Sequence, residues 1–131
     1  MLAMDRDQLR AWLAAYEQAW RSAGTDRLAQ IFTEDATYLQ APYRVPAVGL
    51  PAIARMWDAE RDGPDEVFRM TSELVAVEGD TGVAKVQVWY GEPVRQEYLD
   101  LWVMRFADDG RCREFEEWPF WPGSAKTAAE D

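Results

Sequence analysis

Residues 82–118, GVAKVQVWYGEPVRQEYLDLWVMRFADDGRCREFEEW, decide the fold class. Apolar and polar side chains alternate through much of this stretch, which is typical of β-strands. Turn residues interrupt it at Gly91–Pro93 and at Asp109-Gly110, and an earlier turn is expected at Gly79-Asp80. Consecutive hairpins of this kind predict an antiparallel meander. Its predicted strands cover residues 67–78, 82–90, 95–107 and 111–118.

The first half of the chain has helical periodicity. A row of apolar residues at helical spacing predicts an amphipathic helix over residues 5–23, with Asp5 as N-cap. A shorter helix is expected after Thr25, a short strand over residues 36–40, and a third helix beginning near Pro51. Helices gathered before a run of strands indicate an α+β fold. We expect three N-terminal helices packed on a strongly curved antiparallel sheet, cone-shaped with an internal pocket.

The chain predicts a single domain. Its 131 residues are enough to bury a core without disulfides, and no repeat or linker divides them. We expect a folded core over residues 5–122. The small and polar residues 123–131, GSAKTAAED, predict a flexible tail.

Composition excludes several classes of partner. A formal charge of -10 argues against nucleic acids and against anionic membranes, because both are bound by clustered Lys and Arg. No apolar run has membrane-spanning length, and the first residues show no signal peptide pattern. One cysteine, Cys112, fits a reducing compartment. These observations predict a cytoplasmic protein.

The sequence contains 0 histidines. Catalytic arrangements that need histidine, and metal sites ligated by imidazole, are therefore excluded. Acid–base chemistry would have to come from carboxylates, tyrosine, lysine or bound water. We expect neither a cofactor nor a metal.

Three segments carry a family resemblance: IFTEDATY (31–38), VGLPAIARMW (48–57) and MRFADDGRCREFEEW (104–118). With the element order, they resemble the SnoaL-like branch of the nuclear transport factor 2-like superfamily over about residues 5–122. The resemblance implies a cone-shaped pocket fold, often dimeric. It leaves function open, because the superfamily contains isomerases, dehydratases, polyketide cyclases, epoxide hydrolases and proteins without enzymatic activity.

Ketosteroid isomerases of this superfamily allow a comparison by residue. Tyr16 falls where those enzymes keep the tyrosine that binds the substrate oxyanion. Their catalytic carboxylate is replaced by Gln40, and their second oxyanion donor by Trp102. Because an amide accepts no proton at neutral pH, steroid isomerisation by that mechanism is not expected.

Strand alternation predicts which polar side chains meet. In the expected register Gln87, Asp100 and Glu117 form one row across the sheet, facing the helices. Directly paired residues have Cβ atoms about 5 Å apart, so the two carboxyl groups would share a proton. One would then be a neutral acid and the other a base. The last-strand acid of SnoaL-like cyclases also resembles Glu117.

A second interpretation of the sheet stays open. In the first, the aromatic face points to the helices and an aliphatic face forms a dimer interface. In the second, the aliphatic face packs under the helices, and Lys85, Gln87, Asp100 and Glu117 are solvated. The aliphatic residues are Ala84, Val86, Val88, Leu99, Leu101 and Val103.

We predict a pocket for a small apolar molecule that carries polar groups. If catalytic, the chemistry is cofactor-independent isomerisation, cyclisation, hydration or dehydration, with Asp100 and Glu117 as the acid–base pair and Tyr16 as oxyanion donor. The alternative is a non-catalytic binding or dimeric interaction module with a vestigial pocket. The expected ligand-binding residues are Gln40, Trp57, Lys85, Gln87, Trp89, Tyr98, Trp102 and Phe115.

Overall fold

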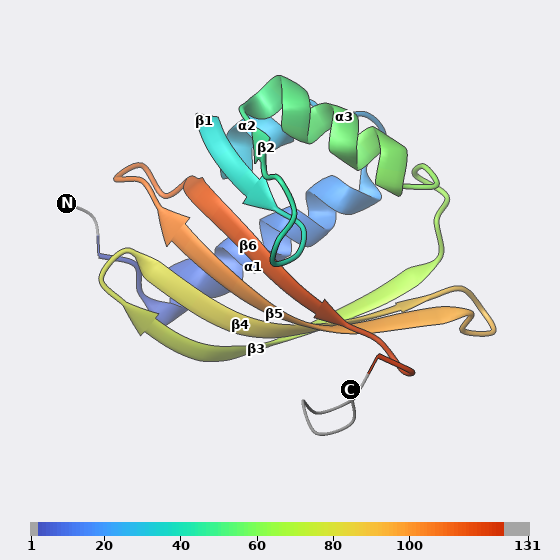
Figure 1. Ribbon diagram of the computed structural model, residues 1–131. Helices are drawn as coiled ribbons and strands as arrows, with labels where there is room; N and C mark the ends of the chain where they lie inside the picture. The colour runs from blue at the N-terminus through green and yellow to red at the C-terminus, as the bar shows by residue number, and fades with distance from the viewer. Residues whose placement is uncertain (1–2, 125–131) are drawn as a thin grey trace.

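The computed structural model describes residues 3–124 (Figure 1). The helices are α1 (Arg6–Arg21), α2 (Leu28–Ile31) and α3 (Leu50–Glu60). The strands are β1 (Phe32–Leu39), β2 (Ala47–Val48), β3 (Phe68–Glu78), β4 (Thr81–Tyr90), β5 (Gln96–Phe106) and β6 (Cys112–Phe120). Within residues 3–124, no helix combines the length and the apolar character needed to cross a membrane.

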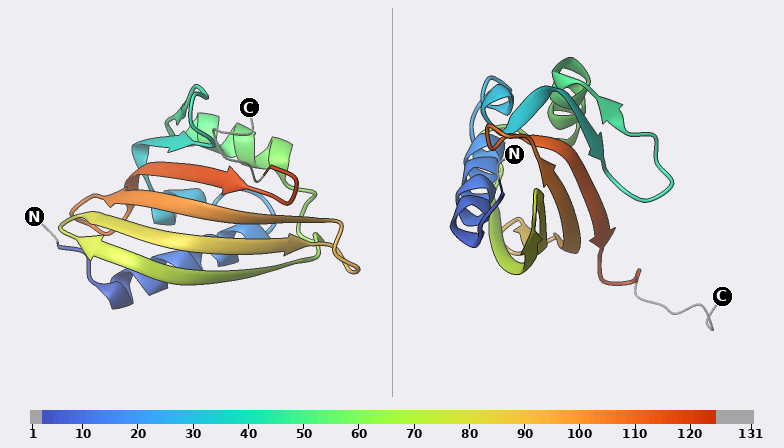
Figure 2. Two further views of the ribbon diagram at one scale, coloured as in Figure 1. Left: turned by 60° about the horizontal axis from the view of Figure 1, so that its bottom comes forward. Right: turned by 90° about the vertical axis from the view of Figure 1, so that its left-hand side faces the viewer.

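The strands form one curved sheet in the order β2-β1-β6-β5-β4-β3. Strands β3 to β6 make the antiparallel meander that the sequence predicts. Strand β1 pairs in parallel with β6, so the sheet is mixed rather than wholly antiparallel. Helices α1 and α3 lie on the concave side of the curved sheet (Figure 2). The predicted α+β class and its three N-terminal helices are confirmed.

Helix α1 is fixed at both ends by side chains. Asp5 accepts a hydrogen bond from the Gln8 backbone at 2.7 Å, and the Gln8 side chain accepts one from the Asp5 backbone at 2.9 Å. This capping box satisfies two amides that the helix leaves free. At the other end, Arg61 donates to the carbonyls of Ser22 at 3.0 Å and Gly24 at 2.7 Å. Arg61 directly follows α3, so it ties the end of one helix to the end of the other.

The first half of α1 fills one end of the concave face. Leu9 lies so close to Gly82 that a Cβ atom there would come within 2.9 Å of Leu9 Cδ2. The Trp12 ring packs edge-on against Phe32 and Phe106, and its indole donates to the Ile31 carbonyl at 2.9 Å. This end is a packed hydrophobic core.

The pairing of β4 with β5 differs from the expectation by one residue. Val86 lies opposite Asp100, where Gln87 was expected. The turn between these strands spans residues 91–95 and is closed by a hydrogen bond from Arg95 N to Tyr90 O at 2.9 Å. Because a slip of one residue exchanges the two faces of a strand, the expected orientation of β4 is wrong. Its inward residues are Ala84, Val86 and Val88, which are buried.

The pairing of β5 with β6 differs by two residues. Trp102 lies opposite Glu117, and Asp100 lies opposite Pro119. The shift accompanies an irregularity in the ladder between Arg105 and Phe106. A displacement of two residues keeps every side chain on its face. Asp100, Trp102 and Glu117 therefore point toward the helices, as the sequence predicts.

Candidate functional site

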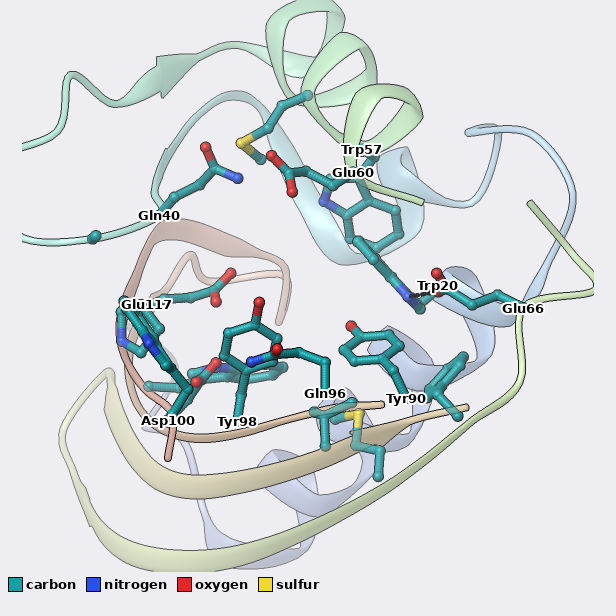
Figure 3. Close-up of a pocket in the computed structure, with 18 of the residues that line it drawn as sticks. Trp20, Gln40, Trp57, Glu60, Glu66, Tyr90, Gln96, Tyr98, Asp100 and Glu117 are labelled. Carbon is teal, nitrogen blue, oxygen red and sulfur yellow. Dashed lines mark hydrogen bonds between the residues drawn. The ribbon is translucent and has the colours of Figure 1, made fainter. Parts of the chain in front are cut away.

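A cavity of about 510 Å³ lies between α1, α3 and one end of the sheet (Figure 3). Helix α1 contributes Tyr16 and Trp20, and α3 contributes Trp57 and Glu60. Strands β5 and β6 contribute Asp100 and Glu117 on the opposite side (Figure 3). A volume of this size is within the usual range of small-molecule pockets.

Asp100 is a buried carboxylate with one oxygen left without a partner. Its side chain is 6% exposed. The indole of Trp102, two residues further along the same face of β5, donates to Asp100 Oδ2 at 3.1 Å. The other oxygen, Oδ1, is buried and accepts no hydrogen bond. Buried polar atoms are normally paired, so this oxygen is a place where a further proton could bind.

Glu117 and Asp100 influence each other's acidity. Burial, and then the negative charge of Asp100, raise the pKa of Glu117 well above its ordinary value of 4.5. Burial also raises the pKa of Asp100, while the hydrogen bond from the Trp102 indole lowers it in part. Two acids that interact this closely titrate as a pair. Burial therefore favours the protonated form of both acids, and the charge of Asp100 adds to this effect at Glu117.

Two tyrosines extend the acid pair into a chain of hydroxyl groups. The Tyr16 and Tyr38 hydroxyls are 2.6 Å apart, and the Tyr38 hydroxyl donates to Glu117 Oε1 at 2.6 Å. Burial and then the charge of Glu117 raise the pKa of both tyrosines well above 10.0, so both are neutral. The parallel pairing of β1 with β6 brings Tyr38 beside Glu117. The result is an unbroken path for a proton from α1 to β6.

Most of the expected site residues line the cavity: Tyr16, Gln40, Trp57, Tyr98, Asp100, Trp102 and Glu117. Phe115 does not, because it lies in the core behind them, 1% exposed, with its ring 4.4 Å from that of Tyr38.

The one-residue difference between the expected and the observed β4–β5 register concerns Lys85, Gln87 and Trp89. All three lie on the outer face of β4, and none lines the cavity. Lys85 is exposed opposite Glu73, and the Arg69 guanidinium lies 4.7 Å from the centre of the Trp89 ring. The expectation that these three contact a ligand inside the cone is therefore wrong.

Sequence reasoning missed several residues of the cavity wall. Tyr38 belongs to the FTEDATY segment, but nothing in the sequence indicates its contact with Glu117. Glu60, at the end of α3, is not among the expected site residues, yet it lines the cavity. Glu66, in the loop after α3, accepts a hydrogen bond from the Trp20 indole at 3.1 Å. Tyr90 was expected on the aliphatic face, and the corrected register brings it into the wall.

Cys112 is a free cysteine with a buried side chain. Burial raises the pKa of the Cys112 thiol to about 12, which leaves it uncharged and unsuited to act as a nucleophile. Among residues 3–124, no group of three or more Cys, Asp or Glu side chains is placed to hold a metal ion.

The fold and cavity define a cone-shaped α+β pocket protein, and comparison with known proteins identifies the family. The family model of the SnoaL-like domain matches residues 7–115. The chain belongs to the SnoaL-like family, as the resemblance predicted. A search of the curated proteins finds no match.

Solved structures share the fold at low sequence identity. A protein designated a SnoaL-like polyketide cyclase, from Jannaschia sp. CCS1, is 16% identical with a TM-score of 0.70, covering 88% of this chain and 90% of its own. A protein designated a ketosteroid isomerase, from Kribbella flavida DSM 17836, is 18% identical with a TM-score of 0.65, covering 92% and 82%. An NTF-2 like protein of unknown function from Burkholderia xenovorans LB400 is 16% identical with a TM-score of 0.69, covering 95% and 91%. At these identities the likeness concerns the fold alone.

Proposed function

We propose that the cavity binds a small, largely apolar molecule with polar groups and catalyses a proton transfer on it without a cofactor. Isomerisation, cyclisation, hydration and dehydration are all reactions of this class. One observation carries the proposal: Asp100 and Glu117 both line an aromatic cavity, and burial raises the pKa of each. Such a pair supplies an acid and a base at the same pH. The SnoaL-like family includes isomerases and cyclases, which supports the reaction class.

In this proposal Glu117 is the proton donor and Tyr16 delivers the proton. With Glu117 neutral, its hydroxyl donates to Tyr38, Tyr38 donates to Tyr16, and Tyr16 donates to an oxygen of the ligand, which reverses the direction in which Tyr38 donates to the ionised acid. Each proton then moves one position along this chain, so Glu117 loses a proton and the ligand oxygen receives one. In this step the ionisation of Glu117 balances the protonation of the ligand. Glu117, now ionised and facing the cavity, then removes a proton from a carbon of the ligand. The ligand has gained a proton on oxygen and lost one from carbon, so it is isomerised. Glu117 is neutral again.

The remaining lining residues orient the ligand. Gln40 offers an amide at the side of the cavity where Glu117 lies (Figure 3). Trp57 and Tyr98 provide apolar wall on opposite sides of the space (Figure 3). A pocket of large aromatic rings with a few polar groups suits a ligand that is mostly apolar.

The test is a pH titration of the side-chain carboxyl carbons by NMR. We expect the Glu117 carboxyl to titrate well above 4.5, and Asp100→Asn to bring that titration down because it removes the neighbouring charge. Asn keeps an oxygen for the Trp102 indole, so the fold should persist. If both acids titrate as free acids do, no acid is held neutral and the catalytic proposal fails. A ligand-binding module without chemistry would then remain.

We also propose that the protein forms a homodimer through the outer face of the sheet. Leu99, Trp118 and Phe120 on this face are 51%, 39% and 54% exposed, and Leu99 lies directly opposite Phe120. Exposed apolar surface of this kind is typical of an interface. Sedimentation equilibrium should give twice the mass of one chain for the parent protein. The Leu99→Lys variant should give the mass of a single chain. A monomeric parent protein would contradict the proposal.

A further inference from the structure

The charges around the cavity are unbalanced. Its lining contains five carboxyl groups, those of Glu60, Asp62, Glu66, Asp100 and Glu117. Two guanidinium groups, those of Arg44 and Arg95, oppose them. Arg95 is already engaged, because it donates to Asp62 Oδ2 at 3.0 Å. Asp62 and Arg95 thus offset each other, and with Glu117 protonated, as proposed above, Glu60, Glu66 and Asp100 still outnumber Arg44. This excess of negative charge favours a cation over an anion.

The walls are the kind of surface that attracts cations. Electron-rich aromatic faces bind ammonium and guanidinium groups, and Trp does so best. The Trp20 and Trp57 rings lie 4.8 Å apart at 67°, and the Tyr16 ring lies 5.1 Å from Trp57. Outside the cavity lining, the Arg61 guanidinium lies 5.7 Å from the Trp20 ring and 5.4 Å from the Trp57 ring. That guanidinium donates to the carbonyls of Ser22 and Gly24, and Trp57 is 1% exposed, so the half-buried Trp20 is the indole of this pair that can meet a ligand.

One buried acceptor at the cavity lacks a donor. Asp100, 6% exposed, has Oδ1 without a hydrogen-bond partner. Glu66 receives the Trp20 indole, and Glu60 lies in the wall across the space from Asp100 (Figure 3). A positive group between these acids would offset their mutual repulsion. A neutral apolar ligand would leave that repulsion unchanged.

We infer that the cavity selects an organic cation, either a protonated amine or a quaternary ammonium group attached to an apolar body. This inference rests on the small-molecule site proposed above and adds the charge of its ligand. The ammonium group lies against the half-buried Trp20 ring, between Glu60 and Glu66. The apolar body extends toward Tyr98 and Trp102.

Three probes of nearly equal shape and different charge test the inference. They are trimethylphenylammonium, tert-butylbenzene and benzenesulfonate, with binding followed by tryptophan fluorescence, because Trp20, Trp57 and Trp102 line the cavity. We expect the cation to bind at least about tenfold more tightly than tert-butylbenzene, and benzenesulfonate not to bind measurably. The preference for the cation should decrease at high ionic strength.

Charge-removing variants identify the acids responsible. Glu60→Gln and Glu66→Gln should each weaken binding of trimethylphenylammonium several-fold and leave tert-butylbenzene unchanged. Gln at position 66 keeps an oxygen for the Trp20 indole. Glu73→Gln, on the outer face opposite Lys85, removes the same charge away from the cavity and serves as the control.

Each other outcome overturns the inference. Equal or tighter binding of tert-butylbenzene or benzenesulfonate removes the selectivity, and so does an equal effect of Glu73→Gln. Failure of all three probes to bind removes the site itself. The carboxyl titration needs no ligand, so it tests the pair of Asp100 and Glu117 independently. A normal titration with selective binding of the cation would end the catalytic proposal and leave this one intact.

Discussion

The two ends of the concave face differ in how they treat buried polar groups. At the closed end, defined by Leu9, Trp12, Phe32, Met104 and Cys112, the Trp12 indole donates to a carbonyl at 2.9 Å, and the Cys112 thiol donates to the Glu114 carbonyl at 3.2 Å. At the open end, defined by the cavity, Trp57 Nε1 and Asp100 Oδ1 are buried without partners. The buried polar groups named at the closed end therefore have hydrogen-bond partners, whereas those named at the open end do not.

The difference teaches where this fold tolerates polar groups that lack partners. An unpaired buried group costs about 1–3 kcal/mol, so a chain keeps it where another molecule can complete the pairing. Strand β5 contributes to both ends, with Met104 in the core and Asp100 at the cavity. Packing and chemistry are therefore separable along one strand, and substitutions can test that separation.

The largest expected effect compares one substitution at both ends. Met104→Ala removes a fully buried side chain at the closed end and should lower the free energy of unfolding by about 2–5 kcal/mol. Met70→Ala removes a half-buried side chain that lines the cavity, and should cost about 1 kcal/mol or less. Urea denaturation measures both. Equal losses would mean that the open end is packed as tightly as the closed end.

The hydroxyl chain gives the next effect. Tyr38→Phe removes the hydroxyl that bridges Tyr16 and Glu117, and should cost about 2 kcal/mol because two hydrogen bonds are lost. Tyr16→Phe removes one bond and should cost about 1 kcal/mol. Tyr98→Phe at the same cavity is the matched control. A larger loss for Tyr16→Phe than for Tyr38→Phe would contradict the bridging role.

Glu117→Gln should stabilise the protein at neutral pH. Because its pKa is raised in the folded state, Glu117 binds its proton more tightly there than in the unfolded chain. The associated stability is fully present below the ordinary value of 4.5 and is lost as the pH rises through the folded-state pKa. The glutamine variant lacks this loss. A tenfold change in proton affinity corresponds to about 1.4 kcal/mol, so we expect a gain of about that order at pH ~7.5 and none at pH ~4.

Thermal unfolding at both pH values measures this gain. Glu116→Gln serves as a charge-matched control, because Glu116 lies on the outer face and an amide oxygen can still accept from the Trp118 indole. A Glu117→Gln variant less stable than the parent protein at neutral pH would show that the ionised carboxylate is structurally required at the open end.

The smallest effect concerns the corrected orientation of β4. Lys85→Ala should change the free energy of unfolding by no more than about 0.5 kcal/mol, and should leave probe binding unchanged. Gln40→Ala, inside the cavity, should weaken probe binding instead. Weaker binding in the Lys85 variant would show that this side chain contributes to the site, and that its assignment to the outer face of β4 is wrong.

Sequence patterns were sufficient for the strands but not for their registers. The alternation in β5 and β6 predicts that Asp100 and Glu117 face the helices, and a shift of two residues leaves that prediction intact. In β4 both faces carry large apolar residues, so alternation cannot choose between Val86 and Trp89 as the inward one. The Arg69 guanidinium covers the Trp89 ring, which makes the outer position acceptable for a tryptophan.

Long-range pairing accounts for the rest of what the sequence did not predict. Tyr38 and Glu117 are 79 positions apart, and they meet because β1 lies parallel to β6. No local signal in either strand indicates that pairing. Residue type and periodicity were enough to predict that Asp100 and Glu117 face the cavity, whereas the hydroxyl chain could be found only from the topology.

The strand order has a consequence for how the molecule assembles. Residues 112–120 are made last among the strands, yet they lie between β1 and β5 in the sheet. During synthesis from the N-terminus, β1 therefore cannot pair with its parallel neighbour until residues 112–120 have been made. A nascent chain that stops before Cys112 contains the strands of the β3–β4 and β4–β5 hairpins. It lacks Glu117, and it lacks the strand that lies between β1 and β5. The site proposed here therefore requires β6 to be paired with β1 and β5.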